Sequence, residues 1–206
     1  MNAARQVFLV DDEPELRRAL RRLLNAEGFE VEDFGSASEL LARVSDSTVG
    51  CLVLDLAMPE VDGLALQQRL AQTGAALSIV FLTGHGDIPA SVQAIKAGAV
   101  DFLTKPVKRA DLLRAVNAAL GQARERQGAL LAGAELRARL SLLTRREREV
   151  FTHVIAGKLN KVIAADLGTT EQTIKVHRAR VMEKLAVASV ADLVRVAQQL
   201  GVEPAP

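Results

Sequence analysis

The first part of the chain alternates between short apolar runs and longer amphipathic stretches. The apolar runs are rich in β-formers and cover residues 7–10, 30–34, 51–54, 78–82 and 101–103. Between them, apolar positions recur with helical spacing over residues 15–26, 38–44, 64–72, 90–97 and 110–122. Strands that alternate with helices predict a parallel, doubly wound α/β sheet.

The strand pattern ends at residue 122. The rest of the chain is helical or turn-forming, over residues 123–142, 144–156, 161–167, 171–185 and 189–200. Pro14 suits a first helical turn, Gly28 and Gly98 stand where helices should end, and Ser36 or Ser38 suits an N-cap. We therefore predict an α/β domain over 1–122, a partly helical linker over 123–140 and an all-α domain over 141–206.

Composition excludes several classes of protein. The 206 residues are 49% hydrophobic and 25% charged, which is ordinary for a globular protein and unlike a disordered or collagen-like chain. The single cysteine, Cys51, cannot form an intrachain disulfide, and Asp11 ends the first apolar run too early for a signal peptide. The longest uncharged stretch, 70–86, is shorter than a membrane span. We expect a cytoplasmic protein without a membrane segment.

The charge is unevenly distributed. The whole chain carries a formal net charge of +1, which by itself argues against a polyanion partner. Residues 1–122, however, hold 12 Lys and Arg against 16 Asp and Glu, a net −4, whereas residues 123–206 hold 14 against 9, a net +5. An acidic α/β part is thus joined to a basic helical part.

Chemically active side chains follow the predicted strands. Asp11 and Asp12 follow the first strand, Asp55 the third, Thr83 the fourth and Lys105 the fifth. Ligands of an open parallel sheet bind beyond the carboxyl ends of its strands, and crowded carboxylates are tolerated when a cation joins them. Oxygen ligands suit Mg²⁺, and a carboxylate beside it can attack phosphorus. A single strand-end Asp is usually a loop cap, but five suitable groups favour a phosphoryl-transfer site.

The segments that carry these residues resemble the receiver domain of bacterial two-component response regulators. They are residues 7–13, 54–63, 82–86 and 102–106, and they begin with Val7-Phe-Leu-Val-Asp11-Asp12-Glu13. The resemblance implies a flavodoxin-like sheet of order 2-1-3-4-5 and phosphorylation of Asp55 by a sensor histidine kinase. It implies Mg²⁺ (or Mn²⁺) on Asp12, Asp55 and the backbone carbonyl of Ala57, with Asp11 acting mostly through water. The resemblance implies that the chain promotes only its own phosphorylation and dephosphorylation. We therefore expect it to have no other enzymatic activity.

The same resemblance implies a conformational switch. A phosphoryl group adds about two negative charges, and Thr83 can move inward to donate to it. Phe102 matches the family's rotating aromatic residue on the fifth strand, although an ordinary core Phe remains the alternative. The bond between Lys105 and Pro106 is expected to be cis. Rotation of Phe102 would change the surface that receivers use to form a homodimer.

The helical part has a signature of its own. Residues 144–150, 160–178 and 182–185 resemble the helix-turn-helix domain of the LuxR/FixJ class. Ala164 supplies a small residue at a helix crossing, Gly168 a tight turn and Ile174 an apolar anchor. Over nearly its whole length the chain is similar to FixJ-like response regulators of the FixJ/NarL family. This implies binding to double-stranded promoter DNA and contact with RNA polymerase.

Helical geometry sorts the residues of the predicted recognition helix, 171–185. Ile174, Val181 and Leu185 share one face, which must pack inward. The opposite face should enter the major groove, where Val176 suits a thymine methyl and Lys175 can reach guanine. The candidate DNA contacts, to bases or to phosphates, are Thr170, Gln172, Thr173, Lys175, Val176, His177, Arg178, Ala179, Arg180 and Lys184.

Several alternatives remain open at this point. A haloacid-type phosphatase also uses a strand-end Asp, but it needs a second Asp where this chain has Ala57. The helical part could instead bind protein, with the chain acting as a phosphate sink, although its basic outward face argues against that. His85 could influence dephosphorylation or be a solvated loop residue. We further hypothesise that residues 123–140 hold the two domains in an inhibitory arrangement until Asp55 is phosphorylated.

Overall fold

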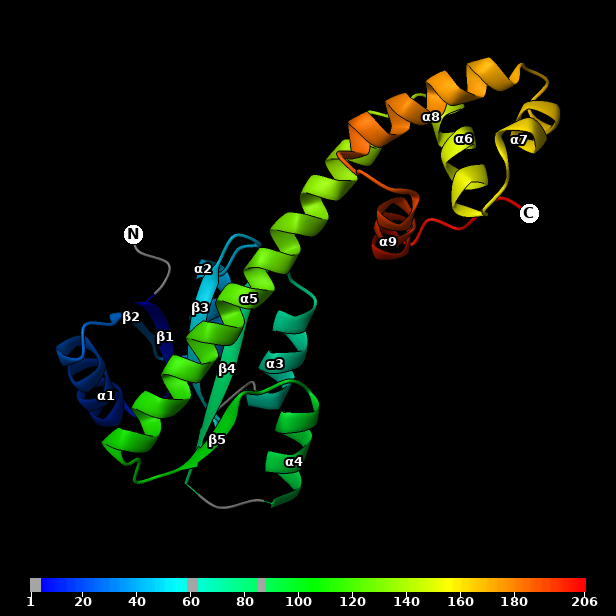
Figure 1. Cartoon of the computed structure of the whole chain (residues 1–206). Coiled ribbons are helices and arrows are strands. Elements are labelled where there is room, and N and C mark those ends of the chain that lie inside the picture. Colours follow the sequence, from blue (N-terminus) through cyan, green and yellow to red (C-terminus); the bar gives the residue numbers. More distant parts are fainter. Residues whose placement is uncertain (1–4, 59–62, 85–87) are drawn as a thin grey trace. The chain divides into compact units, whose positions relative to one another are not determined.

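The computed structural model describes residues 5–58, 63–84 and 88–206 (Figure 1). Its described part contains a five-stranded parallel sheet of order β2-β1-β3-β4-β5, which confirms the expected order. The strands are β1 (Gln6–Val10), β2 (Glu30–Phe34), β3 (Val49–Asp55), β4 (Ala76–Thr83) and β5 (Asp101–Thr104). Every residue of β1, β3 and β4 is buried, as expected for the central strands of a sheet covered on both faces.

Helices follow the strands at the predicted places. They are α1 (Pro14–Ala26), α2 (Ala37–Arg43), α3 (Gly63–Ala71), α4 (Ile88–Lys96), α5 (Arg109–Ser141), α6 (Arg145–Ile155), α7 (Asn160–Asp166), α8 (Glu171–Leu185) and α9 (Val190–Leu200). Apart from α5, each limit agrees with its predicted limit to within two residues. Pro14 starts α1, and Gly28 and Gly98 follow α1 and α4 with positive φ. The Ser36 side chain, and not that of Ser38, accepts the N-cap bond of α2.

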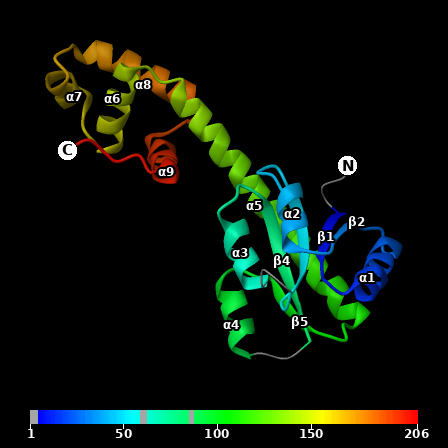
Figure 2. The same ribbon diagram turned by 180° about the vertical axis from the view of Figure 1, so that it is seen from behind.

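Two apolar layers hold the sheet. On one face, Leu24 of α1 and Val116 of α5 are fully buried against alternate strand residues. On the other face, Leu40 of α2, Leu66 of α3 and Ala94 of α4 are fully buried against the intervening strand residues (Figure 2). Since strand side chains alternate between the two faces, both cores come from the same apolar runs. Cys51 lies in the first core, and burial raises the pKa of its thiol.

Helix α5 differs most from expectation, because it continues over the whole predicted linker, 123–140. Ala123 is the last buried residue of α5. It packs against Val49 and Ala76, the first residues of β3 and β4. Gly128 and Gly133 disfavour a helix by about 1 kcal/mol each. Leu, Ala, Glu and Arg around them are strong helix formers and offset this cost.

Helices α6 to α9 form a second core. The predicted inward face of α8 is confirmed, since Ile174, Val181 and Leu185 are 0%, 1% and 1% exposed. Phe151 of α6 and Leu193 of α9 belong to the same core. A capping box starts α6, in which the Thr144 hydroxyl and the Glu147 carboxylate each accept a backbone N–H.

The chain divides into two compact units, Met1–Gly128 and Ala129–Pro206. The division falls inside α5, so the functional limits of the linker stay a prediction. Within the described ranges, no helix is both long and apolar enough to cross a membrane.

Gly63, the first residue of α3, approaches the sheet too closely to carry a side chain. A Cβ there would lie 2.8 Å from the Asp55 carbonyl oxygen and 2.8 Å from Cε1 of Phe81. We expect Gly63→Ala to lower the free energy of unfolding of the first unit by about 1–3 kcal/mol, because α3 must shift. The measurement is hydrogen exchange of the β3 and β4 amides.

The matched control is Gly121→Ala, because a Cβ at Gly121 of α5 meets no atom within 4 Å. This change should leave the same amides equally protected or raise their free energy of opening by about 0.5–1 kcal/mol. Equal protection in the two variants would show that the close approach of Gly63 has no energetic weight.

Candidate functional site

The carboxyl edge of the sheet brings the five predicted groups together. Asp55 and Thr83 are the last residues of β3 and β4, Asp11 and Asp12 directly follow β1, and Lys105 directly follows β5. Beside them is a cleft of about 370 Å³. Its lining residues are Asp12, Glu13, Asp55, Leu56, Ala57, Thr83, Gly84 and Lys105.

Three carboxylates crowd this edge. Asp11, Asp12 and Asp55 each place one oxygen within 4.8 Å of those of the other two. Asp11 and Asp55 are 0% and 3% exposed, whereas Asp12 is open to solvent. Burial raises the pKa of Asp55, and the hydrogen bond from Lys105 opposes this rise. Three clustered carboxylates offer only oxygen ligands, and such a donor set fits Mg²⁺.

The ammonium of Lys105 is the cation in this cluster. Its Nζ lies 2.9 Å from Asp11 Oδ2, 3.1 Å from Asp55 Oδ1 and 3.1 Å from Glu13 Oε1. Burial by itself would lower the pKa of Lys105, but its bonds to these carboxylates raise the pKa above the ordinary value. The Lys105–Pro106 bond is cis, as expected.

Backbone contacts fix Asp11 in its buried place. The Glu13 backbone N–H donates to Asp11 Oδ1 at 2.8 Å, and Arg17 Nη1 of α1 donates to the Asp11 carbonyl at 2.6 Å. Glu13 itself is not among the residues predicted for the site. Its only signal in the sequence is that it is the third acidic residue in a row after β1.

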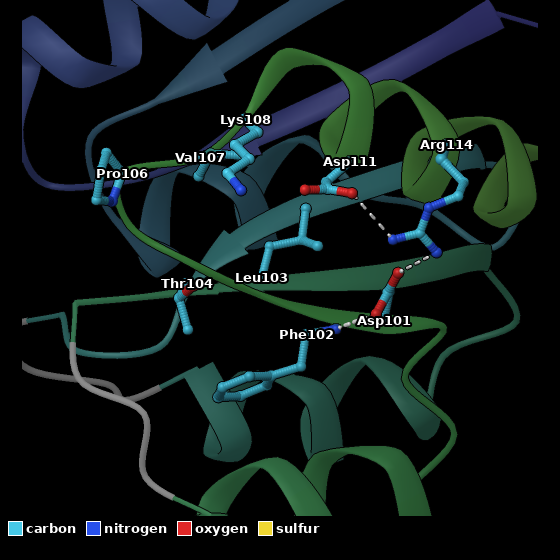
Figure 3. Close-up of a pocket in the computed structure, with 9 residues that line it drawn as sticks. All are labelled: Asp101, Phe102, Leu103, Thr104, Pro106, Val107, Lys108, Asp111 and Arg114. Atoms are coloured by element: carbon cyan, nitrogen blue, oxygen red, sulfur yellow. Dashed lines mark hydrogen bonds and ion pairs between the residues drawn. The ribbon is translucent and has the colours of Figure 1, made fainter.

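The two predicted switch residues lie on neighbouring strands. Thr83 is 3% exposed at the end of β4 and lines the cleft. Phe102 packs with its ring centroid 6.1 Å from that of Phe81 and borders an open groove with Val92 and Ile95 of α4. Figure 3 shows Phe102 and Leu103 on opposite sides of β5. Residues 59–62 of the predicted motif 54–63, and the candidate residue His85, lie outside the described residues.

A pocket of about 300 Å³ lies beside β5 and the start of α5 (Figure 3). Arg114 of α5 is 3.5 Å from Asp101 of β5 and 3.4 Å from Asp111 of its own helix. Asp111 and Arg114 have the i,i+3 spacing of a helical ion pair, but no pattern in the sequence indicates the contact with Asp101. It ties the first turns of α5 to the edge strand that carries Phe102.

The outward face of α8 is exposed as predicted. Gln172, Lys175, Ala179 and Arg180 are open to solvent, and Val176 is 42% exposed. Thr173, His177 and Arg178 are partly buried, and the Thr170 side chain caps the helix by accepting from the Thr173 N–H. Arg178 Nη1 donates to Asn160 of α7 at 3.1 Å, and Lys175 lies 3.7 Å from Glu171.

Lys184, one of the predicted DNA contacts, makes two contacts within its own unit. Its Nζ donates to Glu147 Oε2 at 2.6 Å and to the Leu142 carbonyl at 3.1 Å. Glu147 is only 2% exposed, and this bond, opposed by burial, lowers the pKa of its carboxyl. Because the Lys184 ammonium neutralises a buried carboxylate, it is poorly placed to bind a DNA phosphate at the same time. Lys184, whose side chain is 32% exposed, thus holds α8 to α6, and its predicted contact with DNA stays a prediction.

The arginines that begin α6 also bind within their own unit. Arg145 and Arg146 both pair with Glu149, and Arg146 additionally donates to the Leu167 carbonyl. Arg148 donates to the Leu140 carbonyl at 3.1 Å. Arg146 and Arg148 thereby tie the first turn of α6 to neighbouring segments of the same unit.

Comparison with known proteins identifies both units. Residues 7–117 match the family described as response regulator receiver domain, and residues 141–197 match the family described as bacterial regulatory proteins, luxR family. The response regulator protein TodT of Pseudomonas putida is 44% identical over 194 residues, which cover 94% of this chain and 86% of TodT. The transcriptional regulatory protein FixJ of Rhizobium meliloti is 39% identical over 198 residues, with 96% and 97% covered.

Solved structures of response regulators are also similar to this chain. A low-resolution structure of the response regulator StyR has a TM-score of 0.79 at 44% identity and covers 94% of this chain and 98% of its own. Full-length FixJ from B. japonicum has a TM-score of 0.57 at 37% identity, with 95% and 97% covered.

The ion pair between Glu147 and Lys184 leads to a test of stability. We expect Glu147→Gln to lower the free energy of unfolding of the second unit by about 1–2 kcal/mol at pH 7, because a charge-assisted hydrogen bond is lost. A carboxyl whose folded pKa is depressed stabilises the fold above its unfolded pKa, near 4.3, and this stability disappears as pH falls toward the folded pKa. The measurement is hydrogen exchange of α6 and α8 amides from pH 7 down to about pH 3, which extends below the unfolded pKa.

The control is Glu149→Gln, which removes the same charge from the same helix but from a surface pair. It should change amide protection little, since exposed ion pairs are weak. The ion pair would lack its assigned role if both variants lost the same protection, or if the Glu147→Gln variant kept the full acid dependence of the native chain.

Proposed function

The chain belongs to the LuxR-type response regulators of two-component systems, which regulate transcription, and we propose that phosphorylation of Asp55 controls its binding to promoter DNA. One observation supports this most strongly. A buried carboxylate at a strand end, Asp55, shares an ammonium, Lys105, and a cluster of carboxylates at the mouth of a cleft.

The proposed phosphoryl donor is the phosphohistidine of a sensor histidine kinase. An Asp55 carboxylate oxygen attacks phosphorus, a P–O bond forms, and the P–N bond breaks with its electron pair leaving on the imidazole. Lys105 neutralises charge on the transferring group, and the Thr83 hydroxyl at the same edge donates to one of its oxygens. The buried setting of Asp55 strengthens both interactions, because the local dielectric is low.

Receiver domains bind Mg²⁺ at an acidic pocket, and this chain has such a cluster in Asp11, Asp12 and Asp55. We propose that Asp12, Asp55 and the backbone carbonyl of Ala57 hold Mg²⁺ or Mn²⁺, with Asp11 acting through water. When bound, the metal offsets the negative charge of the phosphoryl group. Ala57 lines the same cleft, which supports its inclusion.

The proposed switch starts at Thr83 and Phe102. Inward movement of Thr83 toward the phosphoryl group would leave space that the Phe102 ring can enter, since Phe102 already packs on its neighbouring strand. Val92 and Ile95, both 47% exposed, border Phe102 in the groove between α4 and β5. A change there would favour a homodimer, which binds paired half-sites more tightly because the second domain is held near the DNA.

In the second unit we propose that α8 enters the major groove. Lys175 and Val176 would read bases, with Gln172, Ala179 and Arg180 beside them, whereas Thr170, Thr173, His177 and Arg178 would contact phosphates or support the helix. The exposure of an apolar Val176 among polar neighbours supports this face as a contact surface. Contact with RNA polymerase and the inhibitory role of residues 123–140 belong to the same proposal. The cytoplasmic location stays a prediction.

Two substitutions separate the two halves of this function. Asp55→Asn should abolish phosphoryl uptake from a histidine kinase or a small phosphodonor, because the amide cannot act as the nucleophile. Lys175→Ala should leave phosphoryl uptake unchanged and weaken binding to a selected promoter site by about 1–3 kcal/mol, because a base contact is lost. Incorporation of labelled phosphate and gel-shift titration measure these effects.

Lys161 serves as a control for Lys175, because it is an exposed lysine on α7, outside the proposed base-reading face. Lys161→Ala should retain the preference for the selected site over unrelated DNA. Phosphoryl uptake by the Asp55→Asn variant would overturn the site assignment. Full sequence preference in the Lys175→Ala variant would remove α8 from base recognition.

A further inference from the structure

Glu13 is a carboxylate at the mouth of the cleft to which no role has so far been given. Its Oε1 lies 3.1 Å from Lys105 Nζ, across 92 residues of sequence. Its side chain is 63% exposed, whereas those of Asp11 and Asp55, which share the same ammonium, are 0% and 5% exposed. Glu13 occupies the N-cap position of α1, but its side chain makes no cap hydrogen bond. Its contact with Lys105 is therefore independent of the helix start.

The three contacts of Lys105 leave its ammonium fully occupied. An ammonium has three N–H donors, and within the described residues three carboxylates surround it at 2.9 to 3.1 Å. A phosphoryl group on Asp55 needs one of these donors. The ammonium must then turn from the Asp55 carboxylate toward the phosphoryl oxygens, and this movement competes with its contacts to Asp11 and Glu13.

Burial decides which carboxylate withdraws. Release of Asp11 would leave a fully buried charge without its cation, which is strongly unfavourable. Asp55 carries the phosphoryl group and remains at the site. Glu13 can turn into solvent and be hydrated at little cost, because it is already largely exposed.

We propose that Glu13 is a positioning residue that restrains Lys105 in the unphosphorylated protein and releases it to the phosphoryl group. This inference rests on the proposed phosphorylation of Asp55. In that step an Asp55 oxygen bonds to phosphorus while the bond from phosphorus to the donor's leaving atom breaks and that atom keeps the electron pair. Glu13 gains and loses no proton, and it exchanges Lys105 for water. Until then its negative charge also opposes the approach of an anionic phosphodonor.

The test measures phosphoryl incorporation into the full-length chain from acetyl phosphate at saturating Mg²⁺. Glu13→Gln should raise the initial rate about two- to fivefold, the size expected for one exposed ion pair. Glu13→Ala should raise it at least as much, because it also removes the neutral acceptor. Glu15→Gln is the matched control. It removes the same charge from an exposed side chain in the first turn of α1, outside the three contacts of Lys105, and should leave the rate near that of the native chain.

Salt provides a second readout. Raising the ionic strength should narrow the difference in initial rate between the Glu13 variants and the native chain, because salt screens the Glu13 charge. Rates of the Glu13 variants equal to or below that of Glu15→Gln, in a native chain that takes up phosphate, would overturn the role of Glu13 alone. Absence of uptake by the native chain would overturn the proposed phosphorylation itself.

Discussion

The ion pairs of the Lys105 ammonium are the interaction on which the receiver unit depends. The strands of a parallel sheet have their carboxyl ends at one edge, so Asp11 after β1, Asp55 at the end of β3 and Lys105 after β5 meet there. Three carboxylates within 4.8 Å of one another repel strongly, and Asp11 and Asp55 are also removed from water. Lys105 makes this arrangement tolerable by pairing with both buried groups. The same pairing places a cation where a transferred phosphoryl group would need one.

A comparable ion pair serves a different purpose in the second unit. Glu147 is as deeply buried as Asp55, but it lies on α6, away from the proposed DNA face, and Lys184 joins it to α8. This pair holds α8 against α6. The acidic first part, net −4, and the basic second part, net +5, thus each contain buried charge. In the first part this charge surrounds the proposed phosphorylation site, and in the second it joins two helices.

Much of this structure can be predicted from the sequence. Apolar periodicity places the strands and the inward face of α8, and the strand-end rule brings Asp11, Asp55 and Lys105 to one edge of the sheet. The length of α5 cannot be predicted in this way, because Gly128 and Gly133 lower helix propensity just where the helix continues. The partners of Lys105 and Lys184 cannot be predicted either. Glu13 and Glu147 lie 92 and 37 residues away from them, and no local pattern reports such a contact.

The central claim is that phosphorylation of one unit changes DNA binding by the other. The direct measurement is the Kd of the full-length chain for one DNA site selected from a random pool, with and without phosphorylation at fixed salt. We expect tighter binding by the phosphorylated chain, by at least about fivefold, as is typical of coupled sites. The same Kd in both states would contradict the claim.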